Sequence, residues 1–138
     1  MSATFYLTQV GPMNRFVLHL EDEDGNTIMK SQYRELKMMM MDELALVHST
    51  ATIDASYDRM HDENGYCFVL RARDAHELGR GDVFETAEEM ERQIEAVKAA
   101  VPDAEFVDQT PEETYVKAID YIREESSKML AAQGIAFE

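Results

Sequence analysis

The chain has 138 residues, of which 28 are acidic and 13 basic, and it carries a net charge of −15 and one cysteine, Cys67. This length suits a single domain with its own hydrophobic core, and one cysteine excludes an internal disulfide. The negative charge argues against direct binding to nucleic acid or to an anionic membrane surface. No apolar run approaches the ~20 residues that span a bilayer, and the first residues lack a signal-peptide pattern. We therefore expect a soluble, cytoplasmic protein.

The first half of the chain predicts strands, turns and then a helix. Apolar alternation in RFVLHLE places Phe16, Leu18 and Leu20 on one face of a strand, and the turn signals VGPMN and DEDGN flank it. A helix follows over LKMMMMDELALVH, residues 36–48. Its core face is expected to consist of Met40, Leu44, Val47 and Ala51. The segment TATID, residues 50–54, then predicts a short closing strand.

The second half repeats this order. The triplet Phe16-Val17-Leu18 returns as Phe68-Val69-Leu70, and the helical apolar residues recur at a slightly shorter spacing. Thr86 and Glu89 have capping-box spacing, which predicts the start of the second helix. The apolar stripe of this helix is Ala87, Met90, Ile94, Val97 and Val101. Pro102 should end the helix, and AEFVD, residues 104–108, predicts a closing strand. Matching order at nearly constant spacing favours a duplication.

A further helix is predicted after the two repeats, over residues 110–138. Thr110 suits the N-cap, Pro111 suits the first helical position, and Glu113 completes a capping box. Gly134 is a stop signal. The apolar face of this helix can pack on the rest of the domain or on a partner chain, and the sequence leaves both alternatives open.

The second repeat resembles the YegP-like family of small tandem-repeat proteins of unknown function. The resemblance is carried by YCFVLRARDAHELGRGDVFET and MERQIEAVKAAVPDAEFVDQT, and in the first repeat by NRFVLHLEDEDGNTIMKSQY. It covers about residues 4–109. The family's fold implies two β-β-β-α-β units that share one sheet and exchange their last strands, and it implies no catalytic residues.

Together these observations predict an α+β fold. Two tandem β-β-β-α-β repeats, residues 1–54 and 55–109, form one antiparallel sheet with the helices on one face. They make a single domain, 1–109, to which the extra C-terminal helix, 110–138, is added.

No catalytic, cofactor or metal site is predicted. The histidines His19, His48, His61 and His76 show neither HExxH nor HxxxH spacing, and no Gly-rich phosphate loop occurs. Cys67 lies beside Phe68 in a predicted strand, where a packing role is favoured over that of a nucleophile. We expect a protein that is not an enzyme and that uses no cofactor.

Two surfaces are candidates for binding. The first is a second apolar strip on the Met-rich helix, formed by Met38, Met39, Met41 and Ala45. A helix that is apolar over so much of its circumference should be covered on two sides, either by the C-terminal helix or by another chain. Methionine suits such contacts because its side chain is flexible and polarizable.

The second candidate is the sheet face turned away from the helices. Strand alternation places Arg15, His19, Arg71 and Arg73 there, which forms a cationic strip in an acidic protein. Solvated arginines paired with nearby carboxylates are one interpretation. A site for an anion or an acidic partner is the other, since arginine can clamp a carboxylate or phosphate with two hydrogen bonds.

The predicted function is therefore a non-enzymatic binding or interaction module of unknown ligand that self-associates as a dimer. The alternative is an acidic inhibitor, or nucleic-acid mimic, that occupies a basic surface of another macromolecule. The acidity itself fits a well-solvated surface, adaptation to high salt, or a basic protein partner.

Overall fold

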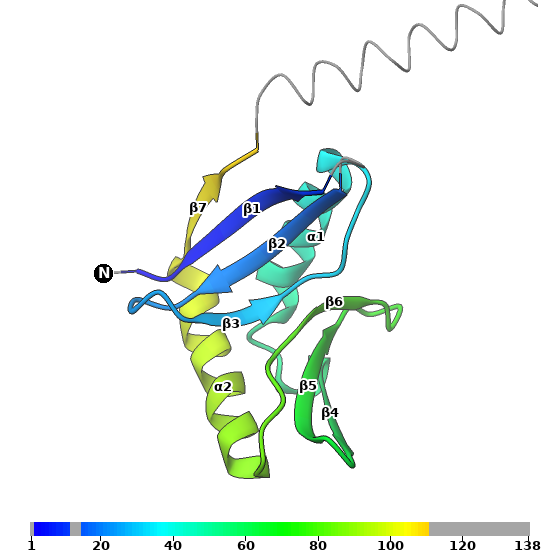
Figure 1. Cartoon of the computed structure of the whole chain (residues 1–138), viewed down its shortest axis with the longest axis vertical. Helices are drawn as coiled ribbons and strands as arrows, with labels where there is room; N and C mark the ends of the chain where they lie inside the picture. Colours follow the sequence, from blue (N-terminus) through cyan, green and yellow to red (C-terminus); the bar gives the residue numbers. More distant parts are fainter. Residues whose placement is uncertain (1, 12–14, 111–138) are drawn as a thin grey trace, which may run out of the picture.

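A computed structural model describes residues 2–11 and 15–110 of the chain. This part contains one mixed sheet with the strand order β4-β5-β6-β3-β2-β1-β7 and two α-helices behind it (Figure 1). The strands are β1 (Thr4–Val10), β2 (Arg15–Glu21), β3 (Thr27–Lys30), β4 (Tyr57–Asp62), β5 (Gly65–Arg71), β6 (Glu77–Arg80) and β7 (Glu105–Asp108). The helices are α1 (Lys37–Thr50) and α2 (Ala87–Ala100), each followed by a short 3-10 turn, Asp54–Ser56 and Val101–Asp103. The predicted α+β class is confirmed.

The sheet is not wholly antiparallel, so that part of the prediction is wrong. β7 pairs with β1 in parallel, from Thr4 opposite Glu105 to Leu7 opposite Asp108. The path of the chain explains the parallel pairing. After α2, which lies behind the sheet, the chain reaches the outer edge of β1, and β7 runs there in the same direction as β1. The last strand of the second half thus completes the sheet of the first half.

The closing strand predicted at residues 50–54 is also wrong. α1 continues through Thr50, and after the 3-10 turn Asp54–Ser56 the chain enters β4 directly at Tyr57. The Tyr57 hydroxyl donates a hydrogen bond to the carbonyl of Ala51 at 2.5 Å, and its backbone N–H bonds to the carbonyl of Asp54. These bonds fold the segment tightly between helix and strand, which leaves no length for a separate strand.

The repeated Phe-Val-Leu triplet does not mark equivalent positions. β2, β3 and α1 begin at residues 15, 27 and 37, and β5, β6 and α2 begin at 65, 77 and 87, so these elements are 50 residues apart rather than 52. The counterpart of Phe16 is Tyr66: Phe16 is bridged to Arg34, and Tyr66 to Phe84. The turn before β5 is two residues shorter than the turn before β2. A slip of two residues keeps every side chain on its predicted face, because strand side chains alternate.

The core lies between the helices and one face of the sheet. As predicted, α1 buries Met40, Leu44 and Val47, with Ala51 just beyond its end. The second stripe is buried at Met90, Ile94, Val97 and Val101, whereas Ala87, the first helical residue, is exposed. Strand residues on the inner face complete the cluster: Phe5, Leu7, Leu18, Leu20, Phe68 and Leu70. Burial of each large apolar side chain contributes roughly 1.5–3 kcal/mol.

The two helices begin differently. Thr86 caps α2, since its hydroxyl accepts a hydrogen bond from the Glu89 N–H at 3.2 Å, as the sequence predicted. α1 follows Leu36, which provides no side-chain cap, and its first turn contains no acidic residue. The start of α1 therefore lacks the side-chain stabilisation that Thr86 gives to α2.

No helix in the described part of the chain is long and apolar enough to cross a membrane. The helix predicted over residues 110–138 lies outside the described residues, apart from Thr110.

The two halves of the sheet meet where β3 pairs with β6, at Lys30 opposite Arg80 (Figure 1). Two glycines allow close packing near this seam. A Cβ on Gly79 would lie 2.9 Å from Cγ of Met29. A Cβ on Gly81 would lie 2.1 Å from Oε1 of Gln93 and 2.3 Å from Cε1 of Phe68.

We predict that Gly81→Ala lowers the free energy of unfolding by about 1–3 kcal/mol, because the added methyl group overpacks the site. It would also displace Gln93, whose amide bonds Asp82 at 3.0 Å and 2.9 Å. Gly79→Ala is the matched control and should cost less, since its nearest neighbour is the flexible side chain of Met29. Urea unfolding measures both variants. A Gly81→Ala protein as stable as the wild type would contradict the predicted steric conflict.

Candidate functional site

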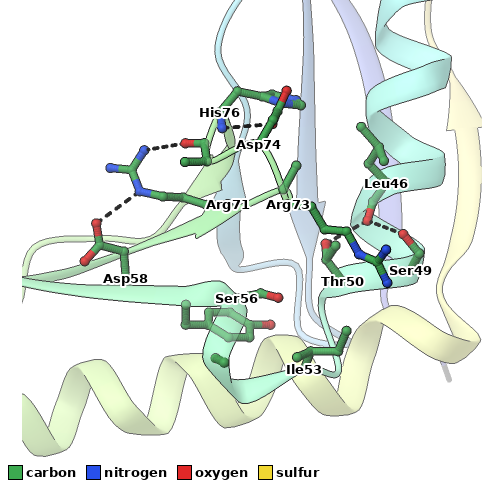
Figure 2. Close-up of a pocket in the computed structure, with 14 residues that line it drawn as sticks. Leu46, Ser49, Thr50, Ile53, Ser56, Asp58, Arg71, Arg73, Asp74 and His76 are labelled. Atoms are coloured by element: carbon green, nitrogen blue, oxygen red, sulfur yellow. Dashed lines mark hydrogen bonds and ion pairs between the residues drawn. The ribbon is translucent and has the colours of Figure 1, made fainter.

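A groove of about 880 Å³ lies between the end of α1 and the turn that follows β5. We call it the Arg73 groove. Its walls are the end of α1, the segment 53–58 that leads into β4, and residues 71–76 (Figure 2). The first wall belongs to the first half of the chain and the last to the second half, so the groove exists only when the two halves are joined.

Arg71, at the end of β5, is fixed by two neighbours. Its Nε donates to Oδ2 of Asp58 at 3.0 Å, and its other guanidinium nitrogen donates to the carbonyl of Ala75 at 3.1 Å. Asp58 lies on the neighbouring strand β4, so this ion pair joins two strands at the rim of the groove. Exposed pairs of this kind contribute at most about 1 kcal/mol.

Arg73 lies in the turn after β5, not in the strand, and its side chain is exposed. It makes no hydrogen bond or ion pair with the residues that the structure describes. Figure 2 shows its side chain extended towards Ser49 and Thr50, away from the guanidinium of Arg71. The end of α1 carries partial negative charge, which favours a cation beside it.

The turn that carries Arg73 is tightly bonded. The Ala72 N–H donates to the carbonyl of His76 at 3.0 Å, and the Ala75 N–H donates to the carbonyl of Ala72 at 2.9 Å. Ala75 has a φ of 71°, a left-handed conformation that is unusual for a residue with a Cβ. The equivalent turn of the first half has Gly25 in this position, with a φ of 85°.

His76 connects this turn to α1. Its Nδ1 bonds the carboxylate of Asp74, and its Nε2 lies 3.1 Å from Oε2 of Glu43. The other oxygen of Glu43 accepts two hydrogen bonds from Arg34, at 2.9 Å and 3.1 Å. The hydrogen bond to Asp74, and after it the bond to Glu43, raise the pKa of His76 above its ordinary value.

The segment 53–58 is anchored to α2 from behind. Asp54 accepts hydrogen bonds from Lys98 and Arg59, and these two cations, Lys98 first, lower the pKa of Asp54 to about 2. Arg59 also pairs with Glu91. Burial raises the pKa of the Tyr57 phenol, so this groove residue remains a neutral hydrogen-bond donor.

The structure does not bring the four predicted cationic residues together. Strands β3 and β6 separate β2, which carries Arg15 and His19, from β5 and its following turn. Arg15 lies over the ring of Tyr33 at 5.4 Å from the centroid. His19 bonds Oε2 of Glu21 at 2.9 Å and stacks on Tyr6 at 5.2 Å. Only Arg71 and Arg73 line the same groove.

The outer sheet face is also less open than strand alternation suggested. Val69, expected on the wet face, is buried at 0% exposure. Its direct neighbours across the ladder are Asp58 and Arg80. Arg80 is paired with Glu77 and Asp58 with Arg71, so long charged side chains flank the valine on this face.

The apolar strip of α1 is exposed among the described residues. Met38 is 61% exposed, Met39 45% and Met41 39%, and Ala45 is exposed as well. Helical spacing places Met38, Met41 and Ala45 on one flank of α1. Met39 lies on the other flank of α1 with Glu43 and Leu46. This flank faces the Arg73 groove, which Leu46 lines. The predicted surface therefore has two parts.

Within the described residues, no group of three His, Cys, Asp or Glu side chains could hold a metal ion. Cys67 is half-buried, and burial raises the pKa of its thiol, which disfavours the reactive thiolate.

Several groove residues were not singled out by sequence reasoning. These are His76, Ser49 and Ile53; sequence reasoning also does not indicate Glu43, which lies outside the lining but bonds His76. One local signal was present: Asp74 precedes His76 by two residues, a spacing at which an aspartate can accept the N–H of the later residue, as it does here at 3.1 Å. The approach of α1 to this turn depends on the packing of both halves and has no local signal.

Comparison with known proteins finds relatives over most of the chain. UPF0339 proteins of Bordetella pertussis and Bordetella bronchiseptica are each 31% identical over 111 residues, which is 80% of this chain and 98% of the relative. No family model matches the chain.

Solved structures show the same fold. YegP of E. coli, a protein of unknown function, has a TM-score of 0.75 and 26% identity over 81% of this chain and 97% of its own. A UPF0339 protein of Shewanella oneidensis also has a TM-score of 0.75, with 21% identity over 81% of this chain and 95% of its own.

The raised pKa of His76 predicts a pH-dependent stability difference between the wild type and His76→Gln. Protonated His76 is bound by Asp74 and Glu43, so its stabilisation is complete below the ordinary histidine pKa of 6.5 and is lost as the pH rises through the higher folded value. The difference in the free energy of unfolding should therefore be larger at pH 5.5 than at pH 9.

Urea unfolding across this pH range measures the effect. Asp74→Asn is the matched control, because it removes the stronger partner of His76 and should reduce the same pH dependence in part. A difference between the wild type and His76→Gln that does not change with pH would contradict the role of this contact.

Proposed function

The chain belongs to the UPF0339 family and is structurally similar to E. coli YegP, and from this premise we propose that the protein is a non-enzymatic interaction module that self-associates through α1. The observation that carries the proposal is the exposure of Met38, Met41 and Ala45 on one flank of this helix. Clustered apolar side chains on a protein surface mark interaction sites, and isolated ones do not.

The position of these methionines supports a contact between chains. They lie in the first turns of α1, which has no side-chain cap at its start, so packing against a second surface would also stabilise the helix end. The end of β7 lies next to this surface, because Lys37 pairs with Asp108, and Phe106 of β7 is 40% exposed. Helix and edge strand together offer a larger apolar area than either alone.

A second copy of the chain is the proposed partner. Two copies joined about a two-fold axis present the same patch to each other, and this is the commonest arrangement of soluble oligomers. Each methionine buried in such a contact contributes roughly 1.5–3 kcal/mol, and its flexible side chain fits an imperfectly shaped surface.

We also propose that the two β-β-β-α units are copies of one ancestral unit. Both contain a ladder irregularity at the same place, between Leu20 and Glu21 and between Leu70 and Arg71. Lys30 pairs with Arg80, its own counterpart 50 residues later, as expected of two copies related by a two-fold axis through the seam.

Light scattering coupled to size-exclusion chromatography tests self-association. We predict that the wild type elutes with twice the 15.8 kDa mass of one chain, in both 0.15 M and 1 M salt, because the contact is apolar and is not screened. Met38→Glu/Met41→Glu should have the mass of a single chain.

The matched control is Met60→Glu, which alters a 44% exposed methionine on β4, away from α1, and should remain dimeric. A monomeric wild type would contradict self-association. If that monomer bound a basic protein with a steep salt dependence, the alternative of an acidic inhibitor would be favoured.

A further inference from the structure

The Arg73 groove contains one cation that the fold does not use. Three basic side chains line it, and Arg71 is held by Asp58 and the Ala75 carbonyl, while His76 is held by Asp74 and Glu43. Arg73 makes no hydrogen bond or ion pair within the described residues. Its planar guanidinium can therefore offer two parallel N–H groups to an anion without breaking a bond of the fold.

One part of the groove, beside the end of α1, is apolar. Leu46 and Ile53 are 37% and 49% exposed, and both line the groove beside the end of α1. The small side chains of Ala55 and Ala72 line it as well. The hydroxyls of Ser49 and Thr50 already donate to the carbonyl of Leu46, at 3.0 Å and 2.7 Å, and so offer no free donor. A ligand would meet one unpaired cation next to an apolar wall, with polar side chains such as Ser56 elsewhere in the groove.

The surrounding charges limit the charge of the ligand. The end of α1 presents partial negative charge, and the carboxylates of Asp58 and Asp74 stand at the rim. A dianion such as a phosphate monoester would be repelled by these groups and would find only one unpaired guanidinium. A single carboxylate matches Arg73 in charge and in geometry.

The size of the groove indicates a small molecule. Its volume of about 880 Å³ lies within the range of roughly 300–1,000 Å³ that is usual for small-molecule sites, which combine apolar walls with a few polar groups.

We propose that the Arg73 groove binds a small amphipathic monocarboxylate. The carboxylate bonds the guanidinium of Arg73, and the hydrocarbon part lies against Leu46 and Ile53. The site is separate from the self-association surface, since Met38 and Met41 lie on the opposite flank of α1.

Octanoate is a suitable probe, because it carries one carboxylate on an eight-carbon chain. We expect saturable shifts of the amide resonances of Ile53, Arg73 and Ala75 when the full-length, ¹⁵N-labelled protein is titrated in 0.15 M salt. Acetate lacks the hydrocarbon and octylammonium carries the opposite charge, so each should bind at least tenfold more weakly than octanoate.

Arg73→Gln should lower the affinity for octanoate about tenfold, the typical loss when a charge-assisted hydrogen bond is removed. Ile53→Ser should weaken octanoate binding and leave acetate binding unchanged. Both residues are exposed, so neither substitution disturbs the core. The matched control is Arg92→Gln on α2, an exposed arginine that is likewise without a hydrogen bond or ion pair among the described residues, and it should bind as the wild type does.

Absence of saturable shifts, equal affinity of Arg73→Gln and Arg92→Gln, or equal binding of octylammonium would each overturn the proposal. The mass of each variant, measured by light scattering, separates this result from self-association: loss of octanoate binding with an unchanged mass concerns the groove alone.

Discussion

The fold depends on the seam between β3 and β6. The first half of the chain supplies three strands and a helix, and the second half supplies four strands and a helix; β3 and β6 join the two sets of strands into one sheet. At the seam Lys30 pairs with Arg80, and Met29 packs where Gly79 has no side chain. The flexible side chain of Met29 fills the space beside Gly79, which lets the two strands pack closely at the seam. The parallel pairing of β7 with β1 adds a second connection between the halves.

The Arg73 groove follows from this closure. The end of α1 comes from the first half and the Arg73 turn from the second, and the contact of Glu43 with His76 holds them at a fixed distance. A substitution at the seam should therefore alter the shape of the groove, although no residue that lines the groove belongs to β3 or β6. The backbone of Ala75 also depends on this closure. Its left-handed conformation is maintained by the hydrogen bonds of the turn, and the turn is held against α1 by His76.

The sequence was sufficient for the elements that depend on local pattern. The stripe of Met40, Leu44 and Val47 and the cap at Thr86 were predicted because helical spacing and capping are local signals. The prediction of a closing strand at 50–54 was wrong because α1 extends through Thr50 and the Tyr57 hydroxyl bonds the Ala51 carbonyl, a contact that strand patterning does not predict.

Strand alternation predicted which face of the sheet each side chain occupies, but it did not predict which strands are neighbours. Arg15 and Arg71 were placed on one face of the sheet, whereas their strands are separated by the two strands of the seam. The resemblance to the YegP-like family was confirmed. Its motifs extend over most of the strands and helices, so the order and spacing of these elements could be compared along the chain. The groove could not be derived in this way, since its walls are far apart in the sequence and meet only after closure.

Arg73 has no carboxylate partner among the described residues, although the chain is strongly acidic. With 28 acidic residues and 13 basic ones, about two carboxylates are present for each cation, and Arg34, Arg59, Arg71 and Arg80 all have a carboxylate partner. Among the described residues, Arg15 and Arg92 also have no ion pair, but Arg15 covers the ring of Tyr33, and Arg92 is an exposed residue of α2 that does not line the groove. Arg73 alone of these three lines the groove beside exposed leucine and isoleucine. An external carboxylate would give Arg73 the partner that the acidic residues around it, each already engaged with Arg71 or His76, do not provide.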